Sequence, residues 1–203
     1  MNRNLSTAGL TGAALTTLTG LAVEVVVKPA TDVSDQQWSY PWTSGPFVAV
    51  SIGYAVLHLL VFLGMLAVLR ALTSRTARIG AGIAAAGTLV LLLAEIASIP
   101  IADQRLDDTG AQVIGAFFGA GVALTAIGLL TAGIAVLRSN DWTGWQRYVP
   151  LGAGVWSLVL IGLSMTSALP LGVAVYGLTL CALFLAVRTL HTPTEPRTRA
   201  RVS

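Results

Sequence analysis

The chain has 203 residues, of which 55% are hydrophobic and 10% are charged, and its mean hydropathy is +0.77. These values lie far outside the range of soluble domains and indicate an integral membrane protein. The formal net charge of +3 does not indicate a nucleic-acid partner, because the charged residues lie in short gaps between apolar runs. The single cysteine, Cys181, excludes an intrachain disulfide and a cysteine-based metal site.

Six stretches are long and apolar enough to cross a bilayer as helices, which requires about 20 residues each. They cover residues 5–27, 47–69, 79–99, 111–137, 149–167 and 171–187, with proline, glycine and polar residues between them. We therefore predict an all-α, polytopic transmembrane bundle of six helices within residues 1–191. The proline- and arginine-containing segment 192–203 is predicted to be a disordered cytoplasmic tail.

The first stretch is the least apolar of the six, because several threonines dilute it. Arg3 followed by an apolar run is also typical of a signal peptide, but the run is long and residues 28–30 form a poor cleavage site. We expect a retained helix. Small residues on one of its faces would let a neighbouring helix approach closely, and they are Gly12, Thr16 and Gly20.

The segment between the first two stretches is the longest connection and contains Trp38, Tyr40 and Trp42. One interpretation is a lid that folds back over the outer ends of helices one to three. The other is a belt of aromatic side chains at the membrane surface, without a ligand.

Three ionisable residues interrupt the apolar stretches: Glu24, His58 and Glu95. Such residues cost several kcal/mol in hydrocarbon unless they are paired or hydrated, so they are candidates for function. Helical periodicity places all three toward neighbouring helices, with Tyr54 one turn from His58. We predict a polar cluster of these four residues that opens outward between helices one, two and three.

Depth along the helices limits which of these side chains can meet. Glu24 lies about 6 Å from Lys28 and Glu95 about 7 Å from Pro100 along the helix axis, whereas His58 lies nearer the midplane. The two carboxyl groups can share a site. A direct contact of His58 with a carboxylate is possible, but the depths do not require it. The alternatives are interfacial glutamates and a neutral histidine in an interhelical hydrogen bond.

Metal and haem sites are not expected in this chain. The ligand pairs of helical metal sites, such as Glu-x-x-His, are missing from the apolar stretches. The other histidine, His191, falls in the tail, so two membrane histidines cannot hold a haem within one chain. No cofactor is predicted.

Small residues recur on the third and fourth stretches, where Gly80, Ala84 and Thr88 form one row and Gly115, Gly119 and Ala123 another. Such rows mark close helix contacts in membranes. For Gly115 and Gly119 we expect internal packing, with a homo-oligomer contact as the alternative.

Basic residues predict the orientation, because Lys and Arg near the membrane are retained in the cytoplasm. Only Lys28 and Arg105 flank the outward side. Ten arginines fall at the N-terminus, after the second and fourth stretches and in the tail: Arg3, Arg70, Arg75, Arg78, Arg138, Arg147, Arg188, Arg197, Arg199 and Arg201. We predict a multi-pass protein of the cell membrane with both termini in the cytoplasm.

No sequence motif specifies a reaction or a solute. One hypothesis is a small carrier that receives a proton or solute at the polar cluster, and an equally supported one is a membrane partner or sensor subunit. The alternative is a membrane-embedded enzyme acting on a lipid or isoprenoid-like substrate, with Glu24 or Glu95 as general acid.

Overall fold

The computed structural model describes residues 2–139, 142–164 and 166–190, so the predicted tail over 192–203 lies outside the described residues. Within them the protein is all-α, as predicted. The six α-helices are α1 (Asn2–Ala22), α2 (Ser44–Ala71), α3 (Arg75–Ser98), α4 (Thr109–Ser139), α5 (Val149–Leu163) and α6 (Leu169–Leu190). A π-helix (Val23–Val27) and a 3-10 turn (Lys28–Ala30) prolong α1, and two further 3-10 segments follow α3 (Ile99–Ile101) and precede α5 (Gly144–Tyr148).

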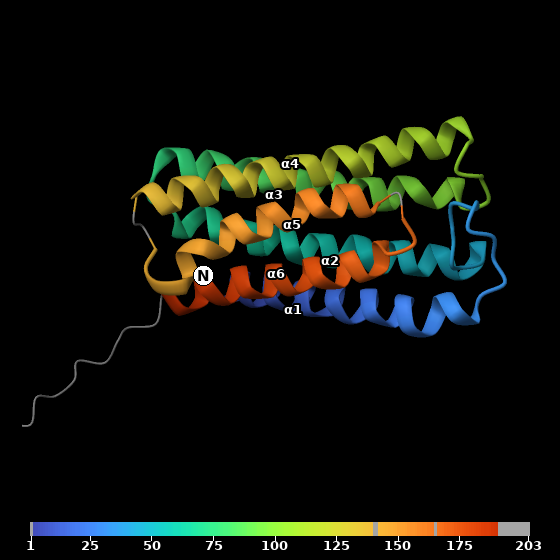
Figure 1. Cartoon of the computed structure of the whole chain (residues 1–203), viewed down its shortest axis with the longest axis horizontal. Helices are drawn as coiled ribbons and strands as arrows, with labels where there is room; N and C mark the ends of the chain where they lie inside the picture. The colour runs from blue at the N-terminus through green and yellow to red at the C-terminus, as the bar shows by residue number, and fades with distance from the viewer. Residues whose placement is uncertain (1, 140–141, 165, 191–203) are drawn as a thin grey trace, which may run out of the picture.

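Consecutive helices run antiparallel in two layers (Figure 1), with α1, α2 and α3 in one layer and α4, α5 and α6 in the other. Each helix packs on the next in the chain, α6 closes against α1, and α2 also contacts α6. The start of α1 and the end of α6 lie at one end of the bundle, which we call the proximal end. The α1–α2, α3–α4 and α5–α6 connections lie at the other, the distal end.

Among the described residues, five helices are long and apolar enough to cross a membrane: α1 with its extension, α2, α3, α4 and α6. The 15 residues of α5 span only about 22 Å, less than the roughly 30 Å of a hydrocarbon core. The predicted fifth span continued to residue 167, but α5 ends at Leu163. At this end Ser164 donates its hydroxyl to the carbonyl of Ile161 (2.7 Å) and Thr166 to that of Leu163 (2.9 Å).

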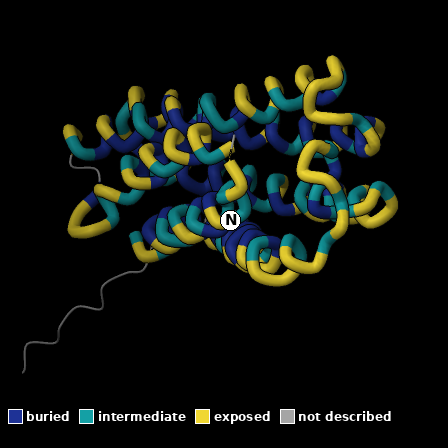
Figure 2. Tube along the Cα trace, turned by 45° about the vertical axis from the view of Figure 1, so that its right-hand side comes forward, coloured by how far each residue is buried: buried dark blue, intermediate teal, exposed yellow. Residues whose placement is uncertain are grey.

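Exposed residues follow the outer faces of the helices (Figure 2), and many of them are large and apolar. Val25 is 69% exposed, Leu93 57%, Phe117 54% and Leu178 55%, and these residues come from four different helical segments. An apolar exterior on every side is unfavourable in water and suited to lipid. The chain is therefore an integral, multi-pass membrane protein.

Glycine allows α3 and α4 to approach most closely. A Cβ atom added at Gly80 would lie 2.6 Å from both the carbonyl oxygen of Gly128 and the amide nitrogen of Ala132. One added at Gly87 would lie 2.6 Å from the amide nitrogen of Thr125. The predicted row on helix three is thus a helix contact surface.

The predicted row on the first helix serves two neighbours instead of one. A Cβ atom at Gly12 would meet α2, 3.1 Å from the carbonyl oxygen of Leu57, whereas one at Gly20 would meet α6, 2.8 Å from the amide nitrogen of Ala174. Eight residues of helix turn the face by about 80°, which explains the change of partner.

The expected internal packing of Gly115 and Gly119 is wrong. Among the described residues nothing lies within 4 Å of a Cβ atom added at Gly119, and one at Gly115 meets only the ring of Trp38, at 3.8 Å. The close α4 contact is made instead by Gly121 and Gly128 on another face of the helix. A homo-oligomer contact through Gly115 and Gly119 stays a prediction.

Candidate functional site

His58 and Glu95 lie opposite each other on adjacent helices. His58 is near the middle of α2 and Glu95 is on the last turn of α3, and His58 Nδ1 lies 3.9 Å from Glu95 Oε1. This distance suits an ion pair but is too long for a hydrogen bond. Their side chains are 19% and 14% exposed. The structure thus brings together the histidine and one of the two predicted carboxylates.

Two serines continue this contact toward the distal end. The hydroxyl groups of Ser51 and Ser98 lie 3.4 Å apart, and Ser98 donates to the carbonyl oxygen of Glu95 at 2.7 Å. Ser51, His58, Glu95 and Ser98 together form what we call the α2–α3 seam. Polar contacts of this kind stabilise helix association where lipid provides no hydrophobic drive.

The Nδ1 atom of His58 is buried and has no hydrogen-bond partner within the described ranges. Most buried polar groups in proteins are satisfied, so such an atom calls for an explanation. A buried imidazole nitrogen beside a carboxylate is in a position to exchange a proton with it.

Glu24 is not brought to this pair. Its Oε2 atom lies 2.8 Å from Lys28 Nζ, one helical turn further along the chain. Lys28 Nζ also donates to the carbonyl oxygen of Ser167, 2.6 Å away, in the α5–α6 connection. Glu24 therefore belongs to an ion pair that ties the end of the first helix to this connection.

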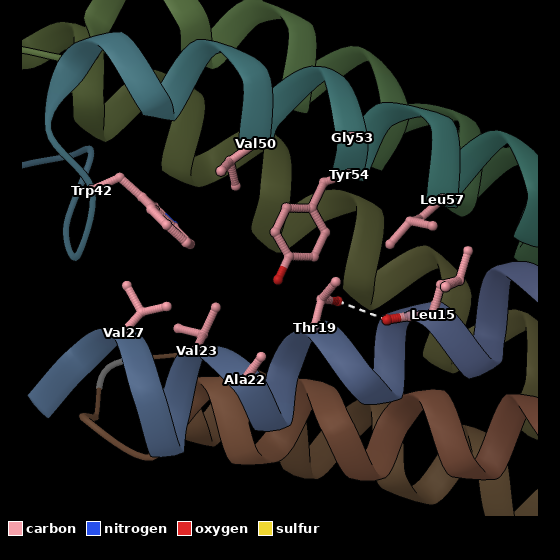
Figure 3. A pocket seen from close by; sticks show the side chains of 10 residues that line it. All are labelled: Leu15, Thr19, Ala22, Val23, Val27, Trp42, Val50, Gly53, Tyr54 and Leu57. Carbon is pink, nitrogen blue, oxygen red and sulfur yellow. Dashed lines mark hydrogen bonds between the residues drawn. The ribbon is translucent and has the colours of Figure 1, made fainter. Parts of the chain in front are cut away.

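Tyr54 faces α1 rather than the pair. Its ring stands in a pocket of about 310 Å³ between α1 and α2, with the hydroxyl directed toward Thr19 (Figure 3). Other side chains of the pocket are apolar. The lining residues are Leu15, Thr19, Ala22, Val23, Val27, Trp42, Val50, Gly53, Tyr54 and Leu57. The predicted cluster is thus divided among three places, with Tyr54 in this pocket, His58 and Glu95 in the α2–α3 seam, and Glu24 in its ion pair with Lys28.

The α1 side of this pocket was not predicted from the sequence. A usable signal was present, because Ala22 and Gly53 are small residues on the facing distal parts of two consecutive helices. The width of the gap between those helices could not be read from either residue alone.

The predicted lid segment lies across the distal end. Trp42 lines the pocket, while Trp38 packs against Phe118 of α4 with ring centroids 6.2 Å apart, and Tyr40 is half-buried. The segment therefore reaches from α1 and α2 to α4, beyond the helices one to three that were expected.

A second connection holds this segment in place. The amide of Trp38 donates to the carbonyl of Gln104 (2.8 Å) and the amide of Leu106 donates to that of Gln36 (2.9 Å). Ser44 also hydrogen-bonds Asp103. The α1–α2 and α3–α4 connections therefore form one structure, which we call the distal clasp (residues 31–44 and 102–108).

In the part of the chain that the structure describes, no three His, Cys, Asp or Glu residues gather closely enough to hold a metal ion. Comparisons with protein-family models, with curated proteins and with solved structures found no match.

Proposed function

We propose that this protein is a small carrier of the cell membrane in which His58 and Glu95 exchange a proton, and that both of its termini are cytoplasmic. In this orientation the distal end faces outward and α5 also crosses the membrane. The helix ends support the orientation, since Arg70, Arg75 and Arg138 lie at the proximal end. Lys28 and Arg105 lie at the distal end.

The observation that carries the proposal is the 3.9 Å approach of His58 to Glu95 between two membrane-spanning helices. Ionisable residues inside such segments mark proton and solute pathways. Imidazole gains and loses protons near neutral pH, and a carboxylate is the usual partner for that exchange. A histidine and a glutamate on separate helices thus provide a proton site whose two halves can move relative to each other.

Proton transfer between the two groups changes the attraction between their helices. When His58 is protonated and Glu95 is ionised, opposite charges draw α2 and α3 together. Transfer of the proton from Nδ1 to Oε1 leaves two neutral groups, and this attraction is lost. A proton can therefore alter the α2–α3 seam, which is the coupling that a carrier requires.

The test uses the full-length protein in lipid vesicles that contain a pH-sensitive dye. Inward gradients of small amines, carboxylic acids and amphipathic cations are applied one at a time, and proton movement is recorded. We expect at least one solute to drive proton flux. His58→Gln and Glu95→Gln should each reduce that flux to the level of protein-free vesicles.

Glu24→Gln is the matched control, because it neutralises the other membrane glutamate, whose partner is Lys28. It should retain the flux. Circular dichroism and size-exclusion chromatography establish that each variant is folded. Unchanged flux in both folded seam variants, or no solute-driven flux in the wild-type protein, would overturn the proposal.

A partner or sensor subunit is the second candidate, and an exposed face of α4 favours it. Ala116, Gly119 and Ala120 are exposed small residues on that face. Association through it is tested with Gly119→Cys in a Cys181→Ser background, since Cys181 is the only natural cysteine. Disulfide-linked dimers in native membranes, absent for Gly82→Cys, would support the assembly role.

A lipid-modifying enzyme with a glutamate general acid has less support from the geometry. Neither Glu24 nor Glu95 lines the pocket between α1 and α2, and Glu24 is already paired with Lys28. A general acid must reach the reacting atom, directly or through one water.

A further inference from the structure

The pocket between α1 and α2 has a structural origin in how these helices cross. Toward the proximal end they are in close contact, since a Cβ atom added at Gly9 would lie 2.5 Å from the Cα atom of Gly64. Toward the distal end they separate, and Tyr54 and Trp42 occupy positions along the gap (Figure 3). The two helices thus touch at their glycines, and the pocket lies where they diverge.

The wall formed by α1 is irregular. The helix changes to a π-helix over Val23–Val27, where the amide of Lys28 bonds to the carbonyl of Val23, and both valines line the pocket. The π-helix follows α1 and precedes a 3-10 turn, so it belongs to the end of the helix, where such turns occur. It shapes the wall of the pocket at Val23 and Val27.

The mouth of the pocket opens toward lipid. Ala22 and Gly53 line the pocket and are themselves exposed, and a Cβ atom added at Gly53 would have no atom within 4 Å. Next to them Val25 and Ile52 are 69% and 52% exposed. The pocket is therefore continuous with the apolar outer surface of the bundle.

The walls specify the chemistry of the occupant. The two hydroxyl groups in the pocket are those of Thr19 and Tyr54, and Thr19 already donates to the carbonyl of Leu15 at 2.9 Å. A polar solute would lose its hydrogen bonds with water here without replacement. A volume of about 310 Å³ is at the lower end of ligand pockets.

We propose that this pocket binds one acyl chain of a phospholipid, with the headgroup near Trp42. Hydrocarbon chains surround the mouth at this depth, and an unfilled cavity would forfeit the dispersion contacts of its walls. The indole of Trp42 lies at the distal end of the pocket, and indole rings favour the boundary between chains and headgroups. The site does not depend on the His58–Glu95 pair.

The experiment uses the full-length protein in phosphatidylglycerol vesicles that contain a phosphatidylglycerol with a diazirine group in one acyl chain. After illumination, mass spectrometry of the digested protein locates the attached lipid. We expect labels on Val23, Val27 and Val50 to exceed those on lipid-exposed Phe117 and Leu178.

Gly53→Leu should bring pocket labelling down to the level of Phe117 and Leu178, because Gly53 lines the pocket and a leucine there would narrow its mouth. Gly82→Leu is the matched control, since a Cβ atom added at Gly82 on α3 also has no atom within 4 Å. It should leave pocket labelling unchanged. Ala22→Leu fills the pocket from α1 and serves as the second variant, should Gly53→Leu fail to fold.

Two outcomes would overturn the proposal. One is pocket labelling no stronger than labelling of Phe117 and Leu178, or equally strong in a folded Gly53→Leu or Ala22→Leu variant. The other is labelling of the pocket by a water-soluble diazirine as strongly as by the lipid, because a hydrated pocket does not hold an acyl chain.

Discussion

Glycine residues decide how closely the helices of this bundle approach. At Gly128 an added Cβ atom would meet the backbone of Ala84, and it would lie 2.6 Å from the carbonyl oxygen of Gly80. At Gly119, on another face of the same helix, the space is open. The two glycines therefore differ in packing while sharing the same helix.

We predict that Gly128→Ala lowers the free energy of unfolding by about 1–3 kcal/mol, because backbone atoms cannot move aside as side chains can. Gly119→Ala should be neutral or stabilising by up to about 1 kcal/mol, since alanine favours helix more than glycine does. Unfolding in mixed micelles with increasing denaturing detergent measures both. Equal destabilisation by the two substitutions would contradict the packing described for α3 and α4.

Single residues also show the limits of prediction from sequence. The apolar surroundings of His58 and Glu95 identified both as intramembrane polar residues, and periodicity placed them toward neighbouring helices. The same criteria applied to Glu24, but a flexible Lys28 one turn away supplies its partner instead. Periodicity gives the face of a helix, whereas side-chain partners depend on the relative rotation of whole helices.

At the level of elements, the distal clasp connects parts of the chain that are distant in sequence. Gln37 and Arg105 form an isolated antiparallel β-bridge, and the ring of Trp38 packs against the ring of Phe118. One indole side chain thus fixes the long α1–α2 connection to α4.

We predict that Trp38→Ala loosens the clasp while leaving the bundle intact. The aromatic pair contributes about 1 kcal/mol, so local opening should increase roughly fivefold. Hydrogen exchange of the amides of Trp38 and Leu106, both bonded across the clasp, measures this opening. Trp145→Ala is the control, because that ring is 52% exposed at the proximal end. Unchanged exchange in Trp38→Ala would show that backbone bonds alone hold the clasp.

Element types were predictable from apolar runs, and some of their ends were not. Five of the six predicted helices are long enough to cross a membrane, but α5 ends at Leu163. Its last predicted residues, up to 167, include Ser164 and Thr166, whose hydroxyl groups bond the backbone of the final turn. Average hydropathy reports which residues can lie in hydrocarbon, and it does not mark the residue at which a helix ends.

For the whole molecule, the distribution of arginine predicts the orientation in the membrane. We expect single cysteines at Asp35 and Asp107, introduced in a Cys181→Ser background, to react with a membrane-impermeant maleimide in intact cells. Cysteines at Arg75 and Thr143 should react only after the membrane is permeabilised. All four positions are exposed in the structure. The reverse pattern would place the pocket on the cytoplasmic side.

The short α5 has a consequence for the surrounding bilayer. The α5–α6 connection stops well short of the distal ends of α2 and α4 (Figure 1), which leaves a step in that surface. A hydrophobic segment shorter than the local bilayer is accommodated by thinning of the membrane or by long flanking side chains. Headgroups and water beside α5 would then reach the level of Ser167, whose carbonyl oxygen accepts a hydrogen bond from Lys28 Nζ. This hydrophobic mismatch would place the contact between Glu24 and Lys28 among headgroups and water instead of hydrocarbon.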